Sequence, residues 1–114
     1  MAYHEPVELL DEKTRNISRA ITSLKEELEA VDWYNQRVAA CQDPQLRAIL
    51  AHNRDEEIEH ATMILEWLRR NMDGWDEQLR TYLFTEGDLT QLENAAEEGG
   101  TSLSRGSLGI GNLE

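Results

Sequence analysis

Apolar residues recur at alternating steps of four and three through the first third of the chain. The series is Ile17, Ile21, Leu24, Leu28, Val31, Asn35 and Val38. Such spacing places apolar side chains along one side of a helix that packs lengthwise on another helix. We therefore expect a long helix from about Val7 to Val38, with Pro6 near its first turn, where a missing N–H costs nothing.

A second series with the same spacing follows after a short break. It reads Leu46, Leu50, Asn53, Glu57, His60, Ile64 and Trp67. Asp43 is the expected N-cap of this helix and Pro44 its first residue, and the helix should end near Asn71, shortly before Gly74. Because the connection between the two helices is short, we expect an antiparallel hairpin.

The second helix is also apolar beside this seam. The flanking positions are Ile58, Ala61, Leu65 and Leu68. A helix that is apolar over more than one face needs more partners than a single antiparallel neighbour. The pattern therefore favours self-association.

The remaining sequence changes in character. A shorter helix is expected from Trp75 to Phe84, with Asp73 as its cap, and a weak helix should begin with a capping box at Asp88. From Gly99 the composition is typical of a flexible linker, and it ends in spaced apolar residues that suit docking into a groove on a partner. We divide the chain into a helical domain (1–87), a weakly structured acidic segment with a linker (88–106) and a docking peptide (107–114).

The net charge and the cysteine content limit the partners and the compartment that we expect for this protein. The net charge of −12 repels nucleic acid and anionic membranes, so neither is an expected partner. One cysteine, Cys41, fits a reducing compartment, and no stretch has the length of a signal peptide core or a membrane span. We therefore expect a cytoplasmic protein. A chain of 114 residues leaves little volume for an independent core.

Two ionisable residues interrupt the second seam. Glu57 and His60 lie three residues apart and can reach a common ion, and a turn near residue 41 brings Glu27 to a comparable depth. No Lys or Arg occupies the seams near that level, so a cation is the expected compensation for the carboxylates. Four-helix di-iron and di-manganese proteins use two single glutamates and two Glu-x-x-His pairs. This chain holds one of each, which predicts a site completed by a second copy.

Other readings remain open at this point. Glu-x-x-His pairs also arise by chance in acidic helices, and oxygen and imidazole ligands suit iron, manganese or zinc. The chain is then either a di-metal enzyme or a non-enzymatic helical module, stabilised by metal and recruited to a partner by its tail. Tyr34, seven residues after Glu27, either hydrogen-bonds a ligand or packs at a rim. His52 is expected on the surface, bonded to Glu56.

Three stretches resemble the encapsulated ferritins, two-helix ferritin-like proteins housed in bacterial encapsulin shells. They are EELEAVDWY (26–34), HNRDEEIEH (52–60) and LRTYLFTEG (79–87), and the tail sequence SLGIGNL is similar to cargo-loading peptides that bind the inner wall of the shell. The resemblance covers about residues 4–87 and, separately, the tail. It implies an all-α fold in which the hairpin and its short C-terminal helix dimerise into a ferritin-like four-helix bundle, within a larger ring, a decamer.

The resemblance also implies ferroxidase activity, the oxidation of Fe(II) to Fe(III) with dioxygen, and delivery of iron for storage inside the encapsulin compartment. Glu27, Glu57 and His60 match the family's iron ligands, so two chains would hold two irons about 3.5 Å apart. Further matches are Glu26 and Glu29, at acidic positions associated with metal attraction and access, and Trp33 and Tyr34, the aromatic pair beside the site. Cys41 and His4 receive no role.

Overall fold

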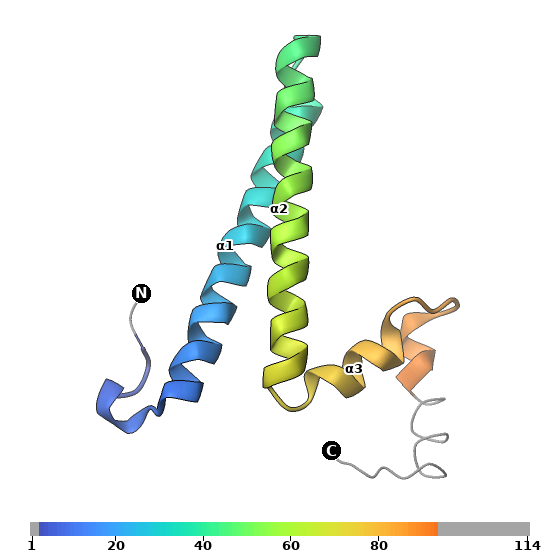
Figure 1. The fold of residues 1–114 in the computed structure, drawn as a ribbon. Helices are drawn as coiled ribbons and strands as arrows, with labels where there is room; N and C mark the ends of the chain where they lie inside the picture. The colour runs from blue at the N-terminus through green and yellow to red at the C-terminus, as the bar shows by residue number, and fades with distance from the viewer. Residues whose placement is uncertain (1–2, 94–114) are drawn as a thin grey trace. The chain divides into compact units, whose positions relative to one another are not determined.

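The structure is a computed structural model that describes residues 3–93. Within that range the chain forms a 3-10 turn, η1 (Val7–Leu9), and the helices α1 (Glu12–Ala40), α2 (Pro44–Asn71) and α3 (Trp75–Tyr82), with no strand (Figure 1). The all-α class expected from the sequence is confirmed. The expected linker and docking peptide lie outside the described residues. The chain divides into two units at Leu68, and each is described by itself.

The long first helix begins at Glu12, so the expected start at Val7 is wrong. Pro6 opens the separate turn η1, after which Leu10 is extended, with φ −106° and ψ 119°. Asp11 then caps α1 by accepting a hydrogen bond of 2.7 Å from the N–H of Thr14. The sequence holds two helix-start signals in succession, and the one that starts the long helix is the aspartate.

The second helix has the predicted bounds, Pro44 and Asn71. Asp43 caps it, because its Oδ2 accepts the N–H of Leu46 at 2.8 Å. At the turn, Arg47 Nε donates to the carbonyl oxygen of Cys41 at 2.9 Å. The predicted antiparallel hairpin is present: α1 and α2 lie closest beside this turn and diverge away from it (Figure 1).

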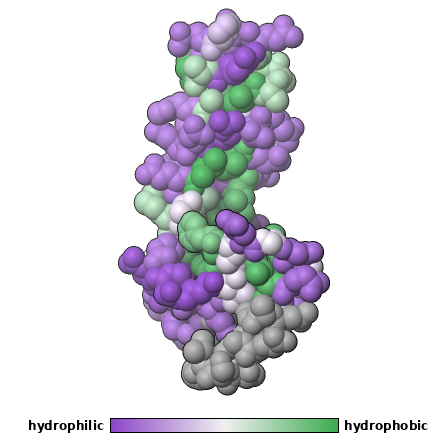
Figure 2. All heavy atoms as spheres, turned by 90° about the vertical axis from the view of Figure 1, so that its right-hand side faces the viewer, coloured by the Kyte–Doolittle hydropathy of each residue, from purple (hydrophilic) through white to green (hydrophobic). Residues whose placement is uncertain are grey.

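One hairpin buries little of its apolar surface. Among residues 3–93, Ala61 and Leu68 are the buried hydrophobic residues. Exposed apolar side chains on the hairpin include Ile21, Leu28, Trp33, Leu46, Ile49, Ile58, Met63 and Trp67. Figure 2 shows hydrophobic surface running between polar regions on the face that it presents. A single copy therefore lacks the core that a domain of this size needs, in agreement with the expected self-association.

The exposed face of α2 includes a predicted metal ligand. Met63 and Trp67 follow His60 at steps of three and four, so the three side chains share one side of the helix. Trp67 is 37% exposed and Met63 is 59% exposed. His60, which is half-buried, therefore lies on the same side of α2 as exposed apolar side chains.

After Leu68, the chain turns at Gly74, which has φ 101°, and enters α3. Two expectations for α3 are wrong: Asp73 does not cap it, because Gly74 is the residue before the helix and provides no side chain, and the helix ends at Tyr82 rather than Phe84. It ends there because Leu83 is extended and Phe84 adopts φ 60°.

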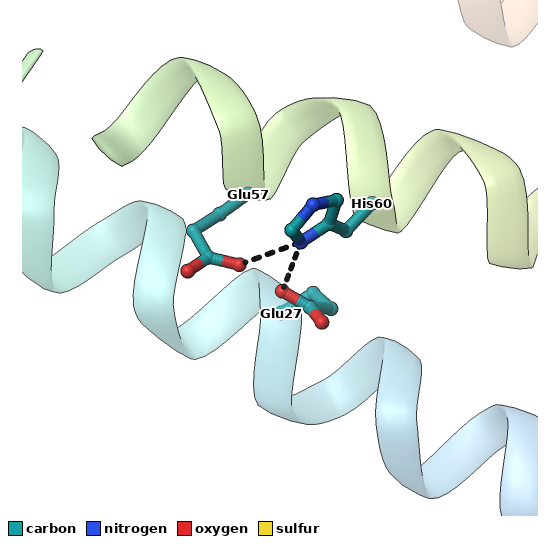
Figure 3. Close-up of side chains that lie close together, drawn as sticks. All are labelled: Glu27, Glu57 and His60. Carbon is teal, nitrogen blue, oxygen red and sulfur yellow. Dashed lines mark hydrogen bonds and ion pairs between the residues drawn. The ribbon is translucent and has the colours of Figure 1, made fainter. Parts of the chain in front are cut away.

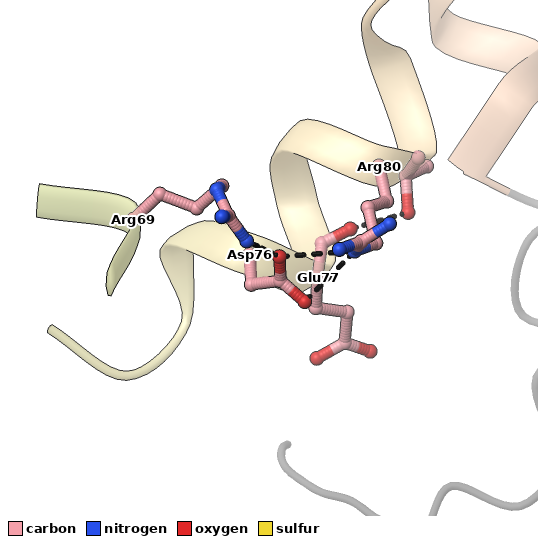
Figure 4. A network of polar contacts seen from close by, with 5 residues as sticks. Arg69, Asp76, Glu77 and Arg80 are labelled. Atoms are coloured by element: carbon pink, nitrogen blue, oxygen red, sulfur yellow. Dashed lines mark hydrogen bonds and ion pairs between the residues drawn. The ribbon is translucent and has the colours of Figure 1, made fainter. Parts of the chain in front are cut away.

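The start of α3 is held by a carboxylate between two guanidinium groups (Figure 4). Arg80 Nε donates to both oxygens of Asp76, at 2.9 and 3.0 Å, and Arg69 from the last turns of α2 donates to Oδ1. These bonds lower the pKa of Asp76, with Arg80 contributing most. Further on, Asp88 caps a helical segment at 89–93 by accepting the N–H of Thr90 at 2.9 Å.

Candidate metal centre

The α2 half of the site is built by the Glu-x-x-His spacing. Residues three apart on a helix project from one side, so Glu57 and His60 leave α2 together. The Nδ1 atom of His60 lies 3.3 Å from Oε1 of Glu57 (Figure 3). Which of these atoms carries the proton depends on the imidazole tautomer.

The other helix contributes Glu27. Its Oε1 lies 3.8 Å from the same Nδ1 of His60, so the imidazole faces a carboxylate from each helix (Figure 3). One ligand atom from each of the three residues lies within 4.8 Å of the others. The hairpin therefore brings together the three side chains that the sequence singles out, and among residues 3–93 they form the one group of three or more such side chains placed to hold an ion.

Like charge dominates the electrostatics of this group. The hydrogen bond that Glu27 shares with Glu57 raises the pKa of the Glu27 carboxyl, and partial burial and the negative charge of Glu57 raise it further. Glu26 adds a small effect in the same direction, while His60 opposes it. A bound cation would remove the cause of this shift, because it neutralises both carboxylates at once.

The three side chains are neither sealed in the hairpin nor fully in solvent. The exposed fractions are 25% for Glu27, 26% for Glu57 and 45% for His60. Ligand atoms that remain accessible at a divergent two-helix surface can be approached by a second hairpin. One copy holds one single glutamate and one Glu-x-x-His pair, which is half of the residue set that four-helix di-metal proteins use.

The donor set fits iron. Two carboxylates and an imidazole, without a thiolate, form a set of hard and borderline ligands that suits Fe(II), Mn(II) or Zn(II). Carboxylate oxygen also favours the harder ion Fe(III). The 4.8 Å spread of the ligand atoms is close to what one ion can span after small rotations of the side chains.

The other predicted site residues lie around this centre with separate partners. Tyr34 is half-buried on α1, and the guanidinium carbon of Arg37 lies 5.0 Å from the centre of its ring. Its hydrogen bond to a ligand stays a prediction. Glu26 and Glu29 are exposed, as acids that attract cations should be, but the structure gives no further test of their role. His52 is exposed and pairs with Glu56 at 3.1 Å, which confirms the expected surface pair.

Sequence reasoning missed Arg54. Arg54 is not a seam position, but it lies one turn before Glu57 and its side chain is only 26% exposed. Its Nη1 donates to Oδ1 of Asn35 on α1 at 3.0 Å, and its Nε donates to Asp55 at 3.1 Å. The guanidinium bonds therefore go to these two side chains and leave the glutamates of the centre uncompensated.

No helix in the described range 3–93 combines the length and apolar character required to cross a membrane.

Known proteins resemble this chain over almost its whole length. An encapsulated ferritin-like protein of Rhodospirillum rubrum is 60% identical over 97% of this chain and 86% of its own length. A ferritin-like protein of Thermotoga maritima is 59% identical over 97% of this chain and 96% of its own length. The crystal structure of protein ne0167 from Nitrosomonas europaea matches with a TM-score of 0.75 and 58% identity, covering 78% of this chain and 98% of that one. Residues 2–86 match the EncFtn-like family, and the chain therefore belongs to this family of ferritin-like proteins.

Proposed function

We propose that this protein is a ferroxidase that oxidises Fe(II) to Fe(III) with dioxygen at a di-iron site shared by two copies. The observation that carries the proposal is the convergence of Glu27, Glu57 and His60 at one accessible point of the hairpin. Membership of a ferritin-like family supports iron as the metal.

The residues of this centre would hold the iron and favour its oxidised form. Glu27 and Glu57 supply anionic oxygen, which binds Fe(III) more strongly than Fe(II) and so favours the loss of an electron. To bind a metal, His60 must be neutral and the two carboxyl groups must be ionised, so metal binding should weaken as the pH falls. Dioxygen takes up two electrons and two protons to give hydrogen peroxide, or four of each to give water, and each Fe(II) supplies one electron, so oxygen uptake should follow iron oxidation in the ratio that this product sets.

Two copies are required because one hairpin offers three ligands where a di-metal centre uses six residues. The exposed apolar face that contains His60, Met63 and Trp67 supports the same arrangement, since a second hairpin laid on that face would bury it and bring the second ligand set to the first. A homodimer within a larger ring is the proposed assembly.

The test is aerobic oxidation of Fe(II), followed by the absorbance of Fe(III) and by oxygen uptake. Loss of a residue that only orients a metal ligand lowers metal affinity or activity by about 10 to 100-fold. Loss of a ligand itself costs more, so Glu57→Ala and His60→Ala should each slow the reaction by more than about 100-fold. Matched controls are Glu12→Ala and His52→Ala, which remove exposed side chains of the same types on the same hairpin. Rates that stay unchanged in both ligand variants would rule out this site.

We propose that the protein acts inside an encapsulin compartment, where the shell stores the oxidised iron. The name of the Rhodospirillum rubrum relative, encapsulated ferritin-like protein, and the similarity of the tail to cargo-loading peptides support this. Deletion of residues 104–114 should leave oxidation intact and abolish co-purification with a co-expressed shell protein. Encapsulation that survives the deletion would refute the docking role of the tail.

The alternative function is a helical interaction module in which metal serves structure alone. Metal analysis combined with oxygen uptake separates the two. A structural site holds an ion, for instance zinc, and consumes no oxygen when Fe(II) is added. A ferroxidase consumes oxygen in proportion to Fe(II).

A further inference from the structure

Polar contacts connect α1 and α2 at three successive levels of the hairpin. Arg47 bonds the carbonyl oxygen of Cys41 at the turn, Arg54 bonds Asn35 at the next level, and His60 meets Glu27 at the third. Each step along α2 is matched by a step of similar length back along α1, as an antiparallel pair in one fixed alignment requires. The Arg54–Asn35 bond is the level between the turn and the metal centre.

Apolar packing gives the hairpin little to fix this alignment. Ala61 and Leu68 are the buried hydrophobic residues in the described range, and both lie beyond Glu57 from the turn. A slip of α2 by one helical turn displaces it by about 5.4 Å. The ligand atoms lie within 4.8 Å of one another, so such a slip would take Glu27 out of reach of His60.

A single polar residue in an otherwise apolar seam is an established means of fixing register between helices, because any other alignment leaves a polar group unpaired. Arg54 lies beside the seam of α2 rather than in it, and Asn35 is an exposed position of the α1 seam, so their bond is a polar contact of this kind at the edge of the helix pair. The side chain of Arg54 is as buried as those of Glu27 and Glu57, at 26% exposure, and its bond to Asn35 reaches across to the other helix. Asp55, the next residue on α2, accepts a second bond from Nε of Arg54.

We infer that Arg54 and Asn35 are a positioning pair that holds α1 and α2 in the alignment needed to assemble the metal ligands. The inference rests on the proposed metal site and assigns neither residue a bond to the ion. It also separates the geometric effect of Arg54 from that of its charge. A positive charge one turn from a cation site disfavours the cation, so its charge and its positioning act in opposite directions.

The experiment measures Co(II) binding to the full chain by the visible absorption of the bound ion, which reports its ligand geometry, together with Fe(II) oxidation. Arg54→Met keeps the length of the side chain and removes the guanidinium, and Asn35→Leu removes the acceptor without changing any charge. Each should weaken Co(II) binding by about tenfold or more, as the loss of a residue that orients ligands does. Asn35→Asp keeps an acceptor oxygen and should retain binding.

The control is Arg19→Met. Arg19 Nη1 also donates to an asparagine, Asn16, but within α1, and its side chain is 59% exposed. The Arg19→Met variant should bind Co(II) as tightly as the unaltered protein does. Binding that is unchanged in Asn35→Leu, or tighter in Arg54→Met, would overturn the positioning role and leave only a charge effect.

A mutant cycle on the metal-free protein tests the pair independently of the metal site. If Arg54 and Asn35 act through their mutual bond, adding Asn35→Leu to Arg54→Met should lower the urea midpoint no further than the first change alone. Additive losses would refute the pairing. If the unaltered protein binds no Co(II) through His60, the proposed function fails, and this cycle still decides whether the two helices are aligned by these residues.

Discussion

Two carboxyl groups, one in each unit of the molecule, differ in the charge of their neighbours. In the hairpin, Glu27 faces the carboxylate of Glu57, and its pKa is raised. At the start of α3, Asp76 lies between the guanidinium groups of Arg80 and Arg69, and its pKa is lowered. Both groups are only partly exposed. The chain therefore pairs Asp76 with two arginines, whereas, within the described part of the chain, the basic neighbour of Glu27 is the imidazole of His60 alone.

The difference distinguishes an acid that already has cationic partners from a pair of acids that could bind a cation, as the proposed site requires. Asp76 already has its cations, and its bonds connect the last turns of α2 to α3 within that unit. Glu27 and Glu57 repel one another, and an imidazole that changes charge near neutral pH compensates them incompletely. Two acids held together with only an imidazole beside them lower the stability of the metal-free protein. A bound divalent ion would convert this repulsion into attraction.

The largest effect expected from this comparison is stabilisation by metal. At a free metal concentration 100 times the dissociation constant, binding raises the free energy of unfolding by about 2.7 kcal/mol. This corresponds to a rise of about 10 °C in the unfolding midpoint. The rise should be seen on adding Co(II) or anaerobic Fe(II) in a thermal melt. It should be absent in Glu27→Gln and present in Asp76→Asn, because only the first change removes a ligand. A rise of equal size in both variants would place the metal elsewhere.

The sequence predicts the hairpin, and the meeting of Glu27, Glu57 and His60 within it, because the signals there are local and agree. Asp43 and Pro44 mark the start of α2 as cap and first residue, and the step of three from Glu57 to His60 fixes their common side on any helix. The meeting with Glu27 follows from the shortness of the turn alone. Those features hold whatever the rest of the chain does.

The sequence predicts less well where side chains or backbone depart from the repeat. Arg54 lies beside the seam, where a charged residue is expected to turn to solvent, but its long stem carries the guanidinium across to Asn35. At the end of α3 the apolar pattern continues through Leu83 and Phe84, while the backbone leaves the helix and Phe84 adopts φ 60°. Neither departure has a signal in the spacing of apolar residues.

A smaller effect is expected on the metal-free protein when Glu27 loses its charge. Because the folded pKa of Glu27 lies above its ordinary value of 4.5, the folded state binds the proton more tightly, and the stability from this group is complete below pH 4.5 and lost as the pH rises through the folded value. Glu27→Gln should therefore melt at a higher temperature than the unaltered protein at pH 7 and show little difference at pH 4. A lower midpoint at pH 7 in the presence of a chelator would contradict the repulsion.

The smallest effect, of opposite sign, is expected at Asp76. Its folded pKa lies below the ordinary value of 3.8, so its contribution to stability is present above pH 3.8 and disappears as the pH falls through the folded value. The side chain is 47% exposed, and solvent screening limits the loss in Asp76→Asn at pH 7 to below about 1 kcal/mol. Thermal melts at pH 7 with rising salt provide the check, because added salt should reduce this loss. A loss that is independent of salt would mean that Asp76 acts through hydrogen-bond geometry rather than charge. The contrast with Glu27 would then not be a difference in the charge of the neighbouring groups.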